Sequence, residues 1–299
     1  MSTAISTSFV KAPAQQKVSL YDEPGPKTRR NIRIWSAIVT VFLLALVGAG
    51  LSQFASKGQL DADKWTPFLS WPIWEYLFVG LWGTIQAAAL VAILGGLLGV
   101  FLALGRLSNV RLIRWAATGY IEVARTVPVL LLIYLMLFGL PQLGLNFPLI
   151  WKLVIPLTIA NSAAFAEIIR AGILGLSRGQ REASLSLGMS EAQTTRLIVL
   201  PQAMRFAAPS LITQLVSLVK DTSLGYIVAF TELLYRGQVL SSFNQLLIQT
   251  FVVVTLIYLV FNGALSALAA RLRTRPTKRS PAKPGAPAPT PLVGTPVLD

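Results

Sequence analysis

Long apolar runs without charge constrain this chain more than any other feature of its sequence. Residues 77–104 contain no charged side chain, and about 20 apolar helical residues are enough to cross the ~30 Å hydrocarbon core of a bilayer. Charged residues make up 13% of the chain, whereas a soluble domain carries about 25%. The sequence therefore predicts an all-α polytopic membrane protein.

Six apolar segments have the length of transmembrane helices. They lie near residues 35–54, 77–104, 118–140, 151–174, 206–230 and 246–270. Residues 1–31 and 274–299 are polar and contain several prolines, and we predict disordered tails there. The first span, placed at 32–55, begins too far into the chain for a secretory signal and is long enough to stay as a membrane helix.

Lysine and arginine are distributed unevenly between the loops on the two sides of these spans. Twenty of the 26 lie in residues 1–34, 105–117, 170–205 and 271–299, and four lie in the intervening loops. Since Lys and Arg accumulate on cytoplasmic loops, we predict that both termini are cytoplasmic. The same distribution accounts for the net charge of +14 without a nucleic-acid partner, because the basic residues flank apolar spans.

The chain contains no Cys and no His. This excludes thiol nucleophiles, disulfides and Ser-His-Asp arrangements, and it removes the usual zinc ligands, so we expect no metal site. The sequence also lacks a Gly-x-x-x-x-Gly-Lys-Ser/Thr phosphate loop, and we therefore expect the chain not to hydrolyse ATP itself. An integral membrane enzyme is disfavoured on the same grounds.

One polar stretch, residues 177–201, interrupts this apolar pattern. Two serine–glutamine pairs fit capping boxes: Ser177 with Gln180, and Ser190 with Gln193. Gly188 lies between them, where a left-handed helix end favours glycine, and Pro201 is expected to end the second helix. The stretch predicts two short cytoplasmic helices with a sharp turn, which serve either to dock on another protein or to pack on their own bundle.

Polar and charged side chains inside the predicted spans are candidates for function, because such groups are costly in hydrocarbon. The candidates for a substrate pathway are Asn161, Ser162, Lys220, Asp221, Thr222 and Ser223. Lys220 falls near the middle of its span, where a cation neutralises a substrate carboxylate or forms a structural pair with Asp221. Asn161 and Ser162 fit interhelical hydrogen bonds equally well.

Two further pairs have the spacing of ion pairs on one helix face. Glu122 with Arg125 and Glu167 with Arg170 are spaced i,i+3. They lie near predicted cytoplasmic helix ends, and we assign them gating or structural roles. Gly95 and Gly99 form a small-xxx-small pair, which favours close helix packing.

Residues 182–201 resemble the EAA signature of binding-protein-dependent ABC importer permeases. That signature is Glu-Ala-Ala, then Gly, then an Ile-x-Leu-Pro ending; here Glu182-Ala183-Ser184 precedes Gly188 and Ile198-Val-Leu-Pro201. Other segments resemble the polar amino-acid branch of that family: Gly80-x-x-x-Thr84, Ala166-Glu167-Ile168-Ile169-Arg170-Ala-Gly172, Arg178-Gly179-Gln180 and Lys220-Asp221-Thr222-Ser223-Leu224. The resemblance covers residues 77–273.

The resemblance implies a type I ABC importer permease core with cytoplasmic coupling helices. It implies that an ATPase-coupling surface is formed by Glu182, Ala183, Ser184, Leu185, Leu187, Gly188 and Met189. It also implies an ABC ATPase dimer that uses ATP and Mg, a second permease (a paralogue or a second copy), an extracellular substrate-binding protein, and a place in the bacterial plasma membrane.

The sequence departs from the family pattern at two points, and the second of them bears on the substrate. Ser184 stands where the signature has Ala, a small-for-small exchange, and Arg125-Thr126-Val127-Pro128 stands where the branch often has Arg-Gly-Thr-Pro. Together with the extra first span, this segment resembles actinobacterial glutamate importers. The resemblance therefore implies glutamate or another polar amino acid as substrate. A self-sufficient secondary transporter or channel also explains the spans and charges, but not the helix–turn–helix.

Overall fold

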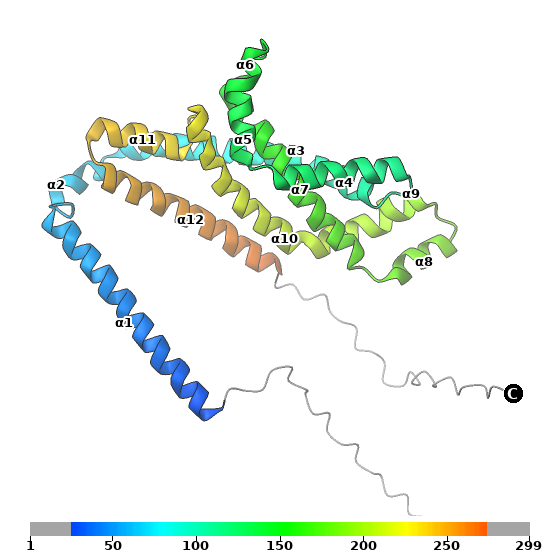
Figure 1. Cartoon of the computed structure of the whole chain (residues 1–299), viewed down its shortest axis with the longest axis horizontal. Coiled ribbons are helices and arrows are strands. Elements are labelled where there is room, and N and C mark those ends of the chain that lie inside the picture. Colours follow the sequence, from blue (N-terminus) through cyan, green and yellow to red (C-terminus); the bar gives the residue numbers. More distant parts are fainter. Residues whose placement is uncertain (1–24, 274–299) are drawn as a thin grey trace, which may run out of the picture. The chain divides into compact units, whose positions relative to one another are not determined.

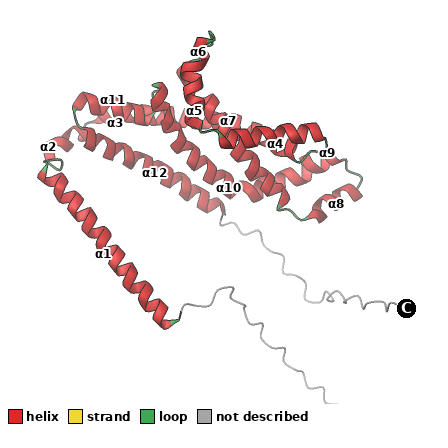
Figure 2. Ribbon diagram, viewed as in Figure 1, coloured by secondary structure: helices red, strands yellow, loops and turns green. Residues whose placement is uncertain are grey.

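A computed structural model describes residues 25–273, and nearly all of them form helices joined by short loops (Figures 1 and 2). The chain divides into two compact units, the first ending at Ala62 and the second beginning at Asp63. The longer helices are α1 Pro26–Ser56, α3 Trp71–Arg106, α4 Arg111–Thr126, α7 Leu149–Leu174, α10 Leu200–Asp221, α11 Leu233–Asn244 and α12 Leu247–Arg273. Shorter elements are α2 Ala62–Trp65, η1 Thr66–Leu69, α5 Val129–Tyr134, η2 Leu135–Gly139, α6 Leu140–Gln142, α8 Arg178–Ser186, α9 Glu191–Gln193, η3 Thr194–Val199 and η4 Thr222–Val228.

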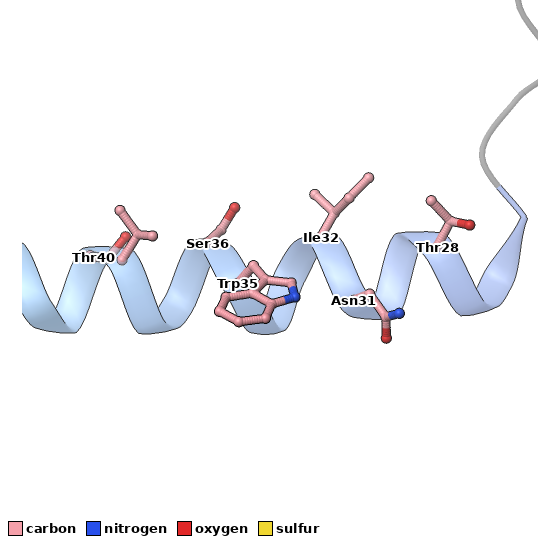
Figure 3. A pocket seen from close by; sticks show the side chains of 7 residues that line it. Thr28, Asn31, Ile32, Trp35, Ser36 and Thr40 are labelled. Atoms are coloured by element: carbon pink, nitrogen blue, oxygen red, sulfur yellow. The ribbon is translucent and has the colours of Figure 1, made fainter.

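Within residues 25–62, the described part of the first unit, the main element is the helix α1. It begins at Pro26, so the predicted disordered tail is wrong for residues 26–31; proline at the first helical position is already set for a helix. A hollow along its flank is lined by α1 alone, including Asn31, Trp35 and Thr40 (Figure 3). A hollow with one helical wall does not enclose a ligand. The rest of the predicted N-terminal tail, and the tail at 274–299, lie outside the described residues.

The second unit is built around the pair α3 and α7. A Cβ atom added to Gly99 of α3 would lie 2.7 Å from Cβ of Phe165 and 3.2 Å from the backbone nitrogen of Ala166, both on α7. Gly95 faces the ring of the same Phe165. The packing role predicted for this pair is therefore confirmed: Gly99 lies too close to α7 for a side chain, whereas a Cβ atom on Gly95 would make an ordinary contact at 3.6 Å. Around them lies an apolar core that includes Val91, Leu157 and Leu218.

The predicted span at 118–140 is not one straight helix. Helix α4 ends at Thr126, and the helical segment Val129–Gln142 continues at 93° to it. Val127 adopts an extended conformation with φ −77° and ψ 123°, as residues before proline do, because the ring of Pro128 clashes with a preceding α conformation. In Figure 1 the segment α5–α6 projects away from the bundle. The prediction of one span at 118–140 did not include this bend, which makes the segment a broken span or a re-entrant loop.

The segment at 231–245, predicted as an external loop, contains the helix α11 packed on α3 and α12. Two glycines of α3 make room for it. A Cβ atom on Gly83 would lie 2.6 Å from the carbonyl oxygen of Thr231, and one on Gly80 would lie 3.0 Å from Cα of Leu233. The buried hydroxyl of Thr84 accepts a hydrogen bond from the backbone N–H of Leu233 at 3.2 Å. The Gly80-x-x-x-Thr84 motif thus forms the packing surface on α3, here called the seat, that contacts the start of α11.

A buried carboxylate completes this seat. Glu232 is fully buried and caps α11, accepting hydrogen bonds from the backbone N–H groups of Leu234 at 2.9 Å and Tyr235 at 2.6 Å. The hydroxyl of Tyr258 on α12 donates a third at 2.9 Å. Three donors offset much of the cost of burying this group. Glu232 therefore links the start of α11 to the middle of α12, next to the hydrogen bond between Thr84 and Leu233.

Four helices among residues 25–273 are long and apolar enough to cross a membrane: α1, α3, α7 and α12 up to Leu268. The bent pair α4 with α5–α6 makes a fifth if it counts as one span. Helix α10 is not in this set, since polar residues such as Gln202, Ser210 and Thr213 recur along it. The protein is thus a multi-pass membrane protein, and the count of six spans stays a prediction.

Candidate functional site

The polar stretch forms a helix–turn–helix at one end of the bundle, where α8 and α9 lie beyond the ends of α4 and α7 (Figure 1). Gly188 has φ +82°, so the predicted left-handed turn is confirmed. The capping box of Ser190 and Gln193 is also confirmed, with both reciprocal hydrogen bonds present. The box predicted at Ser177 is wrong: its side chain makes no capping bond, and only its carbonyl accepts the N–H of Gln180.

The second half of this element does not end at Pro201. Helix α9 continues through the π-helical turn η3 into α10, so residues 191–221 form one continuous helix. Proline breaks a helix by lacking an N–H group and by crowding the preceding turn, and Pro201 falls in the first turn of α10, directly after the wide π turn. We attribute the continuation to this wide turn, and the predicted helix end at Pro201 is wrong.

Side-chain bonds hold the two arms of the element together. The guanidinium of Arg181 on α8 binds the carboxylate of Glu191 on α9 through two bonds, Nη2 to Oε1 at 2.7 Å and Nε to Oε2 at 3.1 Å. The amide of Gln202 donates to Oε1 of Gln180 at 3.2 Å. Sequence reasoning missed Arg181 and Glu191, because their ten-residue separation pairs them only after the turn has formed. The bonds fix how α8 is presented.

The predicted coupling residues divide into a buried and an exposed set. Ser184 is buried, with 5% of its surface exposed, and its hydroxyl donates to the carbonyl of Gln180 at 2.8 Å. Leu187 at the turn is 83% exposed, Leu185 is 36% exposed, and Met189 is half-buried. Glu182 and Ala183 lie on the exposed side of α8. An apolar tip on a polar hairpin is chemically suited to enter a groove of another protein.

Ser184 provides a test of packing inside the element. Ser184→Leu should destabilise the contact of α8 with η3 by about 1–3 kcal/mol, because extra methylene groups have no space in a packed site. Ser184→Ala should be tolerated, since it keeps the volume and removes one hydrogen bond made within α8. Hydrogen exchange at the backbone amides of α8 measures both effects. Equal protection in the two variants would contradict the buried position of Ser184.

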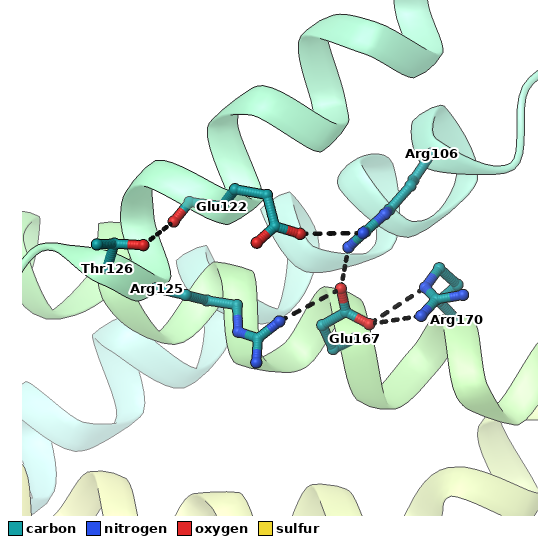
Figure 4. A network of polar contacts seen from close by, with 6 residues as sticks. All are labelled: Arg106, Glu122, Arg125, Thr126, Glu167 and Arg170. Carbon is teal, nitrogen blue, oxygen red and sulfur yellow. Dashed lines mark hydrogen bonds and ion pairs between the residues drawn. The ribbon is translucent and has the colours of Figure 1, made fainter.

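Five charged side chains from three helices gather near the end of α7 (Figure 4). Glu167 of α7 binds Arg170 twice, from Nε to Oε2 at 3.1 Å and from Nη2 to Oε2 at 2.9 Å. Its Oε1 binds Arg106 of α3 and lies 3.8 Å from Nη1 of Arg125 on α4. Arg106 also binds Glu122 of α4, with 3.0 Å between Nη2 and Oε1. We call these five residues the charge cluster.

The charge cluster corrects one of the two predicted pairs. Glu167 with Arg170 is confirmed. Glu122 instead pairs with Arg106, and Arg125 with Glu167, because α3 brings Arg106 between the two carboxylates. Sequence reasoning assigned Arg106 to a cytoplasmic loop only. Arg106 is 16 residues from Glu122 and 61 residues from Glu167 in the sequence, so no local spacing indicates that it pairs with either of them.

The candidate pathway residues of α7 are engaged in helix packing. Asn161 is buried; its amide nitrogen donates to the carbonyl of Leu157 at 3.0 Å, and its oxygen accepts from Gln214 of α10 at 2.9 Å. Ser162 is fully buried, donates to the carbonyl of Ile159 at 2.8 Å and lies 3.1 Å from the hydroxyl of Tyr120. Of the two roles predicted for them, this geometry favours interhelical hydrogen bonds.

The candidate pathway residues after Val219 lie at the junction of α10 and η4. Lys220 is exposed and Asp221 is half-buried. Thr222 is fully buried and donates to the carbonyl of Val219 at 2.7 Å, and the hydroxyl of Ser223 donates to the carbonyl of Lys220 at 2.7 Å. Both hydroxyls therefore bond the helix end, which leaves the ammonium group of Lys220 as the exposed polar group of this cluster.

The structure combines an all-α membrane bundle with a polar helix–turn–helix at one end. Residues 95–278 match the family described as binding-protein-dependent transport system inner membrane component, and the chain belongs to that family.

Named relatives are transport permeases. The chain is 41% identical to the glutamate transport system permease protein GluD of Corynebacterium glutamicum over 228 residues, covering 73% of this chain and 81% of that protein. It is 34% identical to the probable glutamine ABC transporter permease protein GlnP of Bacillus subtilis, covering 68% of this chain and 94% of that protein.

A solved structure of an amino acid ABC transporter with histidines has the same fold. The TM-score is 0.63 at 32% identity, covering 72% of this chain and 97% of that chain. The structure of the MetNI methionine ABC transporter in inward-facing conformations gives a TM-score of 0.54 at 21% identity, which shows likeness of fold alone. The predicted type I importer permease core is thus confirmed.

Proposed function

We propose that this chain is the permease subunit of an ATP-driven importer for a polar amino acid. The observation that carries the proposal is the hairpin of α8 and α9, which a bidentate ion pair holds in shape and which presents the exposed Leu187 at its tip. Family membership and likeness to amino-acid permeases support the same function. In this proposal the exposed set, Glu182, Ala183, Leu185, Leu187, Gly188 and Met189, contacts the ATPase, and Ser184 supports it from inside.

The energy source lies outside this chain in our proposal. A dimer of ATPase subunits binds ATP and Mg, and its closure displaces the hairpin and alternates access to the pathway. An extracellular binding protein delivers the substrate, and a second permease, either a paralogue or another copy of this chain, forms the other half of the pathway. The hairpin and both termini then face the cytoplasm of a bacterial cell, as the distribution of Lys and Arg predicts.

The substrate in our proposal is glutamate or a close acidic analogue. One face of α10 carries polar residues at spacings of three and four: Ser210, Thr213, Ser217 and Lys220. Ser210, Thr213 and Lys220 are exposed, so this face is chemically suited to line a wet pathway. The ammonium group of Lys220 supplies the cation that an extra carboxylate requires, and the likeness to GluD supports the same substrate.

Lys220→Met tests the substrate. We expect the KM for glutamate uptake to rise by about tenfold, which corresponds to 1.4 kcal/mol of lost attraction, while any residual uptake of glutamine keeps its KM. Uptake into proteoliposomes that contain the full complex measures both. Lys57→Met, which removes an exposed lysine at the end of α1, is the matched control. An unchanged KM for glutamate would remove Lys220 from the pathway.

The function itself is tested by ATP hydrolysis in nanodiscs. The chain is co-expressed with its ATPase subunit, and hydrolysis is measured with binding proteins loaded with glutamate, glutamine or histidine. Stimulation by one loaded protein, lost in Glu182→Lys, is expected. Hydrolysis that no binding protein stimulates, or uptake by the chain without ATP, would instead support a secondary transporter.

A further inference from the structure

Two members of the charge cluster, Glu167 and Arg170, lie on α7, the helix that precedes the hairpin of α8 and α9. We call this hairpin, residues 178–193, the coupling hairpin. Glu167 is seven residues before the end of α7 at Leu174, which is about 10 Å along a helix. Three residues separate Leu174 from α8, which begins at Arg178. Arg125 is the last residue but one of α4, next to the 93° bend. The cluster therefore stands between the hairpin on one side and the bend of α4 on the other.

The cluster depends on Glu167 more than on any other member. Three guanidinium groups surround this one carboxylate, and its side chain is only 22% exposed. Glu122, the other acid, is 55% exposed and binds Arg106 alone. Loss of the charge on Glu167 would leave three arginines with one carboxylate, so the remaining groups would repel one another. Loss of Glu122 would leave the contacts of Glu167 in place.

Packing alone holds α4 weakly to its neighbours. The buried side chains of α4 are Ala117, Ile121 and Ala124, which offer little area compared with the α3–α7 contact. The ion pairs of Arg106 and Arg125 add polar links from α4 to α3 and α7. These links are partly buried and form a network, the case in which ion pairs contribute most.

We propose that Glu167 is a positioning residue that makes the adjoining ends of α3, α4 and α7 one rigid body with the coupling hairpin. When α8 is displaced, α7 and α4 then move by the same amount, so the displacement is transmitted in full to the bend at Val127–Pro128. Breaking the cluster lets α7 move while α4 stays behind, so ATP is hydrolysed with less transport. This inference rests on the proposed function and identifies the contact that transmits the movement within the permease.

The test compares Glu167→Gln with the isosteric control Glu75→Gln, which changes an exposed glutamate of α3 outside the charge cluster, in the reconstituted complex. The number of amino acids transported per ATP hydrolysed should fall about fivefold or more in Glu167→Gln, the lower end of typical coupling between sites. It should stay at the wild-type value in Glu75→Gln and recover in Glu167→Asp. A purely structural role would lower the yield of complex but not this ratio.

A second readout follows the movement directly. The chain has no Cys, so spin labels can be placed at Leu112→Cys on α4 and Leu174→Cys on α7, both at exposed positions. We expect one narrow distance, equal with and without bound nucleotide, in the wild-type background. In Glu167→Gln the distance should broaden or change with nucleotide. If Glu167→Gln does not assemble, Arg106→Gln, which keeps the Glu167–Arg170 pair, replaces it with the same expectations.

The outcomes separate the two proposals. Coupled transport in the wild type, with an unchanged ratio and a narrow distance in Glu167→Gln, would overturn the role of Glu167 and leave the importer function standing. Absence of stimulated hydrolysis in the wild type would overturn the importer function itself, and this is seen before any variant is compared.

Discussion

Leu187→Asp is expected to lower substrate-stimulated ATP hydrolysis strongly in the assembled importer while the permease stays folded. Leu187 is 83% exposed, so an aspartate there disturbs no packing within this chain. In a groove of the ATPase, however, the aspartate would bury an unpaired charge in place of an apolar contact. Central interface contacts of this kind typically contribute about 2 kcal/mol or more to binding. We therefore expect the stimulated hydrolysis rate to fall by about 30-fold. Hydrolysis and uptake in nanodiscs or liposomes measure the loss.

Asn109→Asp is the matched control for this prediction. Asn109 is exposed in the loop between α3 and α4, and its substitution adds the same charge outside the coupling hairpin. Stimulation should remain at the wild-type level in this variant. Full stimulation in Leu187→Asp as well would mean that the tip of the hairpin does not touch the ATPase.

Gly83→Ala is expected to unseat α11 and to destabilise the whole bundle. The added methyl group would lie 2.6 Å from the carbonyl oxygen of Thr231, and a backbone atom cannot move aside as a flexible side chain can. Overpacking usually costs about 1–3 kcal/mol, and we expect the upper part of that range here. The shift would also disturb the hydrogen bonds of Thr84 and Glu232 nearby. Thermal unfolding in detergent measures the effect as a lower midpoint.

Gly96→Ala on the same helix should change stability in the opposite direction. A Cβ atom at Gly96 meets nothing within 4 Å, and alanine favours a helix over glycine by about 0.8–1.0 kcal/mol. The unfolding midpoint should therefore stay or rise. Equal midpoints for the two alanine variants would show that α11 is not seated on Gly83.

The sequence predicts well those features that depend on neighbours in the chain. The apolar runs located α1, α3, α7 and α12, and the Ser190 capping box and the turn at Gly188 were predicted from local rules. The bend at Pro128 was within reach of the same rules, because the residue before a proline avoids the helical conformation. The span at 118–140 was predicted from the length of its apolar run alone, and the bend was therefore missed.

The features that were missed depend on contacts between distant segments. Arg106 meets Glu167 only because α3 and α7 lie side by side, and Arg181 meets Glu191 only after the turn has formed. The helix α11 was predicted as a loop, since its start is fixed by a seat on α3 and not by its own pattern. Electrostatic partners of this kind carry no periodic signal in one sequence.

One continuous helix, from Glu191 to Asp221, connects the hairpin of α8 and α9 with the face of α10 that carries Lys220. A genetic selection should reveal this direct connection. Suppressors of a defective hairpin should arise along α10, up to the residues that we propose to line the pathway, and alleles that alter substrate preference should also alter the basal rate of ATP consumption.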